Sequence, residues 1–156
     1  MTHIRSLIAL GFTASALFLT ACGSAPVAMP PPVADYNSTA LIANLSAAKE
    51  VPPNASTGTG VLQASLDKTT SVLTWTVTYS GLTGPVRSAH FHGPSTASIN
   101  AGVALGMSGN LDSPIKGSAT LTPAQAADVL AGKWYVNLHT AINLGGEIRG
   151  QVGNVK

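Results

Sequence analysis

The chain has 156 residues, of which only 9% are charged, and its formal net charge is +2. It contains no run of basic residues, which argues against nucleic acid as a partner, and its single cysteine excludes a disulfide within the chain. The many Thr, Ser, Gly and β-branched residues indicate an all-β extracytoplasmic module.

The first 21 residues have the pattern of a secretory signal peptide. A short positive start that includes Arg5 precedes an apolar run over residues 7–20, which is too short for a comfortable membrane span. The sequence Leu19-Thr20-Ala21-Cys22 then resembles a bacterial lipobox. This resemblance implies cleavage before Cys22 and a lipid on its sulfur. The alternative is ordinary secretion with an unmodified Cys22.

Residues 22–37 are predicted to form a Pro-rich tether, because Pro30-Pro31-Pro32 favours an extended polyproline conformation. We expect the lipid on Cys22 to anchor the chain in the bacterial cell envelope. Gly23 follows the cysteine, where an aspartate would often signal retention at the inner membrane. The expected location is therefore the outer membrane, with the domain facing the periplasm.

From residue 38 onward the pattern is one of short strands separated by Gly and Pro turns. The strongest strand signal covers residues 71–82, where Leu73, Trp75 and Val77 alternate with polar residues. Strands are predicted over residues 39–47, 58–66, 71–82, 86–92, 103–107, 115–121, 134–140 and 147–152. This pattern predicts an all-β, Greek-key β-sandwich or barrel over residues 38–153.

One short helix is predicted over residues 123–130, as a crossover between strands. Thr122 is a good N-cap, Pro123 suits the first helical position, and Gln125 completes a capping-box pattern. Gly132 supplies a stop signal just after the helix.

All histidines beyond the predicted signal peptide lie in two strand-like segments, at His90, His92 and His139. Side chains alternate faces along a strand, so His90 and His92 project to the same side. Two imidazoles from one strand and a third from a neighbouring strand can converge on one metal ion. The alternative is that His90 and His92 are polar residues on a solvated strand face.

Three imidazoles suit copper, or zinc with an open position, and intrinsic affinity favours copper over zinc. Asn137 and Glu147 are the candidates for contacts that orient the imidazoles. Glu50 is predicted to be a structural contact of its Val-Pro-Pro loop. No Ser-His-Asp triad, pair of carboxylates or phosphate-binding loop stands out.

Several stretches together resemble the CHRD domain, a family named from its repeats in chordin and common in bacterial secreted proteins. The resemblance rests on Lys49-Glu50-Val51-Pro52-Pro53, Ala89-His90-Phe91-His92-Gly93-Pro94, Leu121-Thr122-Pro123, Trp134-Tyr135-Val136-Asn137-Leu138-His139-Thr140 and Gly145-Gly146-Glu147-Ile148-Arg149-Gly150-Gln151. It covers about residues 38–153. The family itself implies little chemistry, so a non-enzymatic interaction or structural module at the cell envelope is the alternative function.

A second resemblance, to Cu,Zn superoxide dismutases, concerns the copper site. Those Greek-key barrels carry a His-x-His pair, a later strand histidine, and a Gly-rich turn leading to an arginine that attracts superoxide. His90, His92 and His139 match the histidines, and Gly145-Gly146-Glu147-Ile148-Arg149 resembles the arginine stretch. The bridging histidine, the zinc ligands and the disulfide cysteines of those enzymes have no counterpart here.

The second resemblance implies a copper-only site with three histidines that converts superoxide to oxygen and hydrogen peroxide. Arg149 would be the residue that attracts the small anion. The alternative for Arg149 is a surface salt bridge to Glu147 or Asp112.

Overall fold

The structure is a computed structural model that describes residues 37–155. The predicted signal peptide, Cys22 and nearly all of the predicted tether lie outside the described residues. Within residues 37–155, no helix has the length and hydropathy that crossing a membrane would require.

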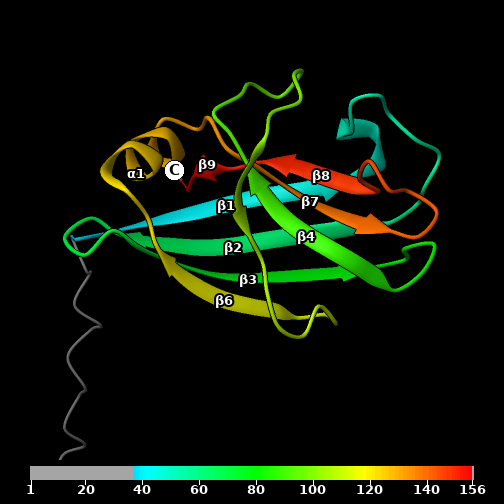
Figure 1. Cartoon of the computed structure of the whole chain (residues 1–156), viewed down its shortest axis with the longest axis horizontal. Coiled ribbons are helices and arrows are strands. Elements are labelled where there is room, and N and C mark those ends of the chain that lie inside the picture. The colour runs from blue at the N-terminus through cyan, green and yellow to red at the C-terminus, as the bar shows by residue number, and fades with distance from the viewer. Residues whose placement is uncertain (1–36, 156) are drawn as a thin grey trace, which may run out of the picture. The chain divides into compact units, whose positions relative to one another are not determined.

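The described chain is mostly β-strand with one short α-helix, which confirms the predicted fold class (Figure 1). Its strands are β1 (Ser38–Ser46), β2 (Thr59–Asp67), β3 (Val72–Ser80), β4 (Val86–His92), β5 (Val103–Gly106), β6 (Ile115–Thr120), β7 (Tyr135–Thr140), β8 (Ile148–Gln151) and β9 (Gly153–Asn154). A 3₁₀-helix, η1 (Ala47–Lys49), follows β1, and the α-helix α1 (Pro123–Leu130) precedes β7.

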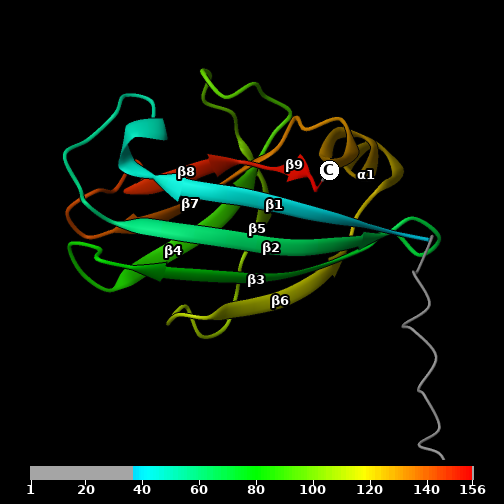
Figure 2. The same ribbon diagram turned by 180° about the vertical axis from the view of Figure 1, so that it is seen from behind.

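All strands join one antiparallel sheet in the order β5-β4-β7-β8-β1-β2-β3-β6, and β9 pairs with β1. The sheet is strongly curved, so that β4 and β7 pass over β1, β2 and β3 (Figures 1 and 2). Contact across this curve is shown by Trp75 of β3 and Phe91 of β4, whose ring centroids are 5.4 Å apart although the two strands are not neighbours. The result is a curled half-barrel with its hydrophobic core inside the curve.

The core residues are those that the alternating strand pattern places on the inner face. Phe91 packs between Trp75 and Trp134, with ring centroids 5.4 and 5.9 Å away. The core also contains Leu41, Leu45, Leu62, Leu66, Leu73, Val77, Ile115, Val136, Leu138 and Ile148. Burying these apolar side chains is the main source of stability in a domain without a disulfide.

The helix α1 lies on the crossover from β6 to β7 and has the predicted capping box. The Thr122 hydroxyl accepts from the Gln125 backbone N–H at 3.2 Å, and the Gln125 side chain accepts from the Thr122 backbone N–H at 2.9 Å. The helix packs near β9 at one end of the sheet (Figure 1).

Strand β7 is buried along its whole length, on both faces. Its inner face joins the core through Val136 and Leu138. Its outer face carries Tyr135, Asn137 and His139. The Ala101 N–H donates to the Tyr135 hydroxyl, and Nδ1 of His139 lies 2.9 Å from the Leu144 carbonyl oxygen. A polar cluster is therefore enclosed on the outside of the sheet, over β4, β7 and β8.

Candidate metal centre

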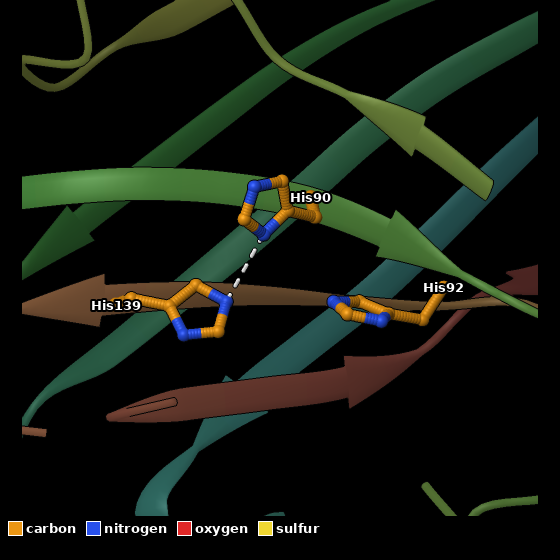
Figure 3. Close-up of side chains that lie close together, drawn as sticks. All are labelled: His90, His92 and His139. Atoms are coloured by element: carbon orange, nitrogen blue, oxygen red, sulfur yellow. Dashed lines mark hydrogen bonds between the residues drawn. The ribbon is translucent and has the colours of Figure 1, made fainter. Parts of the chain in front are cut away.

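The structure brings the three predicted histidines together on the outer face of β4 and β7 (Figure 3). His90 and His92 project from β4 to the side opposite Phe91, as the alternation predicts. His139 projects from the neighbouring strand β7. One ring nitrogen from each of the three lies within 4.8 Å of the others. Nitrogen atoms bound to one ion at about 2.1 Å lie at most roughly 4.2 Å apart, so a metal bound by all three imidazoles would draw the rings closer together.

Backbone carbonyls fix the orientation of two of these rings. Nδ1 of His92 lies 2.9 Å from the Ala101 carbonyl oxygen, and Nδ1 of His139 lies 2.9 Å from the Leu144 carbonyl oxygen. A carbonyl only accepts, so each Nδ1 carries the hydrogen, and Nε2 of the neutral ring keeps its lone pair. This arrangement, in which a second ring nitrogen donates to a carbonyl, is usual for metal-binding histidines.

The remaining polar contacts of the cluster lie between its own members. Nδ1 of His90 is 3.1 Å from Nε2 of His139 (Figure 3). Nε2 of His92 is 2.9 Å from Oδ1 of the buried Asn137. Asn137 therefore contacts His92 at Nε2, and its predicted role in orienting an imidazole stays a prediction.

The surroundings favour neutral imidazoles at two of the three positions. Burial lowers the pKa of His90, and the neighbouring His139 and His92 lower it further. Burial also lowers the pKa of His139, against the hydrogen bond to Leu144. A metal ion binds the deprotonated ring nitrogen, so these shifts reduce proton competition at the cluster.

Arg149 is buried beside the cluster, where a tyrosine separates it from His92. The Tyr135 ring stacks on the His92 ring at a centroid distance of 4.8 Å, and Cζ of Arg149 lies 4.2 Å from the Tyr135 centroid. Strand β7 lies between β4 and β8, so Tyr135 of β7 lies between His92 of β4 and Arg149 of β8. The guanidinium donates to Oδ1 of Asn100 at 2.7 Å and to the Ala97 carbonyl. Direct attraction of an anion by Arg149 stays a prediction.

The alternative interpretation of Arg149, a surface salt bridge to Glu147 or Asp112, is wrong. Arg149 is 2% exposed, and its hydrogen bonds go to Asn100 and Ala97. Across residues 37–155, the only salt bridge joins Lys133 and Asp128. The guanidinium thus holds the 97–100 segment against the sheet, which sequence patterns of charge did not indicate.

Glu147 is not brought to the histidines but belongs to a separate buried network. Its carboxylate accepts from the Ser56 hydroxyl at 2.7 Å, from the Thr83 N–H at 2.7 Å and hydroxyl at 2.6 Å, and from the Thr140 hydroxyl. Burial alone would raise its pKa, but the hydrogen bonds from Thr140, Thr83 and Ser56 outweigh burial and lower it to about 2. The residue is an ionised structural acceptor.

Glu50 is the residue at this site that sequence reasoning missed, because it was assigned only a loop contact. It is 5% exposed, and its Oε1 atom has no hydrogen-bond partner. Burial raises its pKa to about 7, while the charge of Arg149 and the Val51 N–H act in the opposite direction. A cavity of about 390 Å³ is lined by residues that include Glu50, Arg149 and Gln151.

Gly146 allows Glu50 to approach Asn137. Its φ is +128°, a conformation that favours glycine, and a Cβ atom built there would lie 2.5 Å from Oε1 of Glu50 and 2.8 Å from Nδ2 of Asn137. The amide and the carboxylate therefore face the same point over the glycine. The Gly145-Gly146 pair, which lies far from the Val-Pro-Pro motif in the sequence, was the one signal of a close approach at this point.

Comparison with known proteins gives one match. The family model described as the CHRD domain matches residues 41–152, which is most of the chain and includes the three histidines. No curated protein and no solved structure matches the chain.

Proposed function

The chain belongs to the CHRD domain family, and we propose that this domain binds copper through His90, His92 and His139. The observation that carries the proposal is the convergence of one ring nitrogen from each histidine within 4.8 Å on a partly enclosed polar face. Two of the three rings are already oriented by backbone carbonyls, which reduces the reorganisation that binding requires.

Copper is preferred to zinc on chemical grounds. Imidazole nitrogen suits both metals, but the intrinsic affinity of a nitrogen site for divalent copper exceeds its affinity for zinc. Thiolates would favour zinc or cuprous copper, and the described residues contain no cysteine. Loading separate samples of the protein with copper and with zinc, and measuring the metal retained, decides between the two metals.

We further propose that the domain acts at the bacterial cell envelope, anchored by lipid on Cys22 and held off the outer membrane on the periplasmic side. The support is the Leu19–Cys22 pattern and the proline-rich segment after it. Incorporation of labelled palmitate tests this proposal. The intact protein should take up label and the Cys22→Ser variant should not, and labelling of that variant would refute the anchor.

Superoxide dismutation is the finer activity that the copper-site resemblance implies. An open position on copper would admit superoxide, with the metal alternating between the cupric and cuprous states. The assignment of Arg149 as the attracting charge lacks support from its contacts, because Tyr135 lies between it and His92. Storage or delivery of copper would use the same three ligands without turnover.

A second candidate function is an interaction module without metal chemistry, which the family also accommodates. One observation favours it: Ile142 and Leu144, in the segment between β7 and β8, are 72% and 77% exposed. Exposed large apolar side chains close together are typical of protein-binding surfaces. If the protein retains no metal, this becomes the better interpretation.

The proposed copper site is tested by metal content. Purified protein is loaded with copper or with zinc, dialysed, and analysed for metal per chain. We expect about one copper per chain, lost when His90 and His92 are both replaced by Ala. Gln63→Ala, an exposed substitution on β2, is the matched control and should retain copper. Full copper retention by the double variant, with its fold intact by circular dichroism, would exclude these residues as ligands.

A further inference from the structure

We propose that Oδ1 of Asn137 is a fourth ligand of the metal and that Glu50 holds the Asn137 amide in the orientation that presents this oxygen. This inference rests on the copper site proposed above and extends it from three ligands to four. It assigns a role to the Val-Pro-Pro loop, which the three-histidine site does not use.

The first observation is a contact between two acceptors. His92 donates from Nδ1 to the Ala101 carbonyl, so Nε2 of the neutral ring presents a lone pair. That atom lies 2.9 Å from Oδ1 of Asn137, which also presents lone pairs. With a neutral ring, two buried acceptors at this distance repel each other, and either a proton on Nε2 or a metal ion beside both atoms removes the repulsion.

A metal ion bound by both atoms removes this repulsion. Metal bonds to nitrogen and oxygen are about 2.0–2.2 Å long, so adjacent ligand atoms lie roughly 2.9–3.5 Å apart. The 2.9 Å between His92 Nε2 and Asn137 Oδ1 falls in this range. The 3.1 Å between His90 Nδ1 and His139 Nε2 does so too. Both pairs therefore have the spacing of neighbouring ligands around one ion.

The competing arrangement is a flipped amide, in which Nδ2 of Asn137 would donate to His92 and Oδ1 would turn away. Glu50 opposes this flip. Its buried Oε1 atom and Nδ2 of Asn137 lie 2.5 and 2.8 Å from the position of a Cβ built on Gly146, and because Oε1 accepts no hydrogen bond, Glu50 acts on the amide electrostatically. A carboxylate favours the amide NH₂ group beside it and repels the amide oxygen, so Oδ1 is kept toward His92.

An amide oxygen is a harder ligand than imidazole, and this gives the proposal a distinctive consequence. Oxygen ligands favour Cu(II), whereas Cu(I) prefers softer donors. Loss of the oxygen should therefore weaken binding of Cu(II) and leave binding of Cu(I) nearly unchanged. A residue with only a structural role would affect both oxidation states alike.

The test measures the affinities of the purified protein for Cu(II) and Cu(I) at pH 8 by chelator competition. In Asn137→Ala we expect Cu(II) affinity to fall about tenfold and Cu(I) affinity to change less than twofold. The reduction potential then rises by about 59 mV for this one-electron couple. Asn137→Asp keeps an oxygen at the same place and adds charge, so it should bind Cu(II) more tightly than the native protein and raise the preference for Cu(II) over Cu(I).

Glu50 is tested as a positioning residue. Glu50→Leu should weaken Cu(II) binding several-fold without changing Cu(I) binding. Glu50→Gln, which can still place an oxygen opposite Nδ2, should bind Cu(II) as tightly as the native protein. If Glu50→Leu binds Cu(II) like the native protein, Glu50 does not position the amide.

The outcomes separate this inference from the copper site itself. Copper binding that depends on the histidines but not on Asn137, or equal losses of both oxidation states in Asn137→Ala, would overturn the fourth ligand and leave the three-histidine site in place. Absence of copper binding in the native protein would overturn both. If Asn137→Ala does not fold, Asn137→Asp decides, because an unchanged preference between Cu(II) and Cu(I) there would contradict the proposal.

Discussion

Two buried polar clusters lie on opposite sides of β7, and their hydrogen bonding differs. Around Glu147, each carboxylate oxygen accepts two hydrogen bonds, from Ser56, Thr83 and Thr140. Around His92, a ring nitrogen faces an amide oxygen, and Glu50 keeps an oxygen without a partner. A closed polar network stabilises a fold by itself, whereas an unclosed one leaves atoms available for a ligand.

The same contrast appears in the two glutamates. Hydrogen bonds lower the pKa of Glu147 to about 2, and burial raises the pKa of Glu50 to about 7. Glu147 thus stabilises the folded state above pH 4.5 and loses this contribution as the pH falls toward 2. Ionised Glu50 instead destabilises the folded state, because a charge in its buried position is unfavourable. One carboxylate is structural, and the other belongs to the candidate site.

The largest expected effect on stability is that of Glu147→Ala. It leaves the buried donors of Thr83, Thr140 and Ser56 without their acceptor, so we expect the free energy of unfolding to fall by about 3 kcal/mol. Urea denaturation at pH 7 measures this. Ser56→Ala removes one donor and should cost about 1 kcal/mol. A loss below 1 kcal/mol in Glu147→Ala would show that its network does not support the fold.

A smaller loss is expected for Gly146→Ala, which affects the open cluster. The added Cβ meets Glu50 and Asn137 at a backbone φ of +128°, so unfolding should become easier by about 2 kcal/mol. We also expect weaker Cu(II) binding. Gly145→Ala is the matched control, because a Cβ there meets nothing within 4 Å. Equal behaviour of the two variants would contradict the assigned role of Gly146.

The smallest effect is the pH dependence contributed by Glu50 in the metal-free protein. Between pH 4.5 and about 7 the folded state keeps a proton that the unfolded state has released, so the free energy of unfolding falls as the pH rises. We expect a total of about 1–2 kcal/mol after allowance for solvent screening.

Glu50→Gln removes that contribution, and the difference between native and variant curves isolates it. This subtraction matters because the lowered pKa values of His90 and His139 act with the opposite sign. The curves come from denaturation in the presence of a chelator. The free energy of unfolding of the native protein minus that of Glu50→Gln should fall between pH 4.5 and about 7. A value that rises or stays constant would contradict the raised pKa of Glu50.

The sequence predicted what local patterns determine. Alternation along a strand placed His90 and His92 on one side, and the spacing of Thr122 and Gln125 predicted the capping box. Both depend on neighbours a few residues apart. The all-β class followed from the number of short alternating segments between Gly and Pro turns.

The sequence could not predict contacts that strand order and loop paths determine. Tyr135 comes between His92 and Arg149 only because β7 lies between β4 and β8, which periodicity does not reveal. Glu147 was expected beside the histidines, yet its carboxylate lies on the other side of β7, where Thr140 rather than His139 points. Glu50 reaches the site from a distant loop across a glycine, so the charge pattern around it carried no signal.

The most direct test of the copper site is X-ray absorption spectroscopy at the copper edge of the copper-loaded protein, which counts the imidazoles bound to the metal. The account predicts three imidazoles per copper in the native protein and two in His139→Ala, whose ligand comes from the second strand. Fewer than three in the native protein, or an unchanged number after the loss of His139, would contradict a centre shared between β4 and β7.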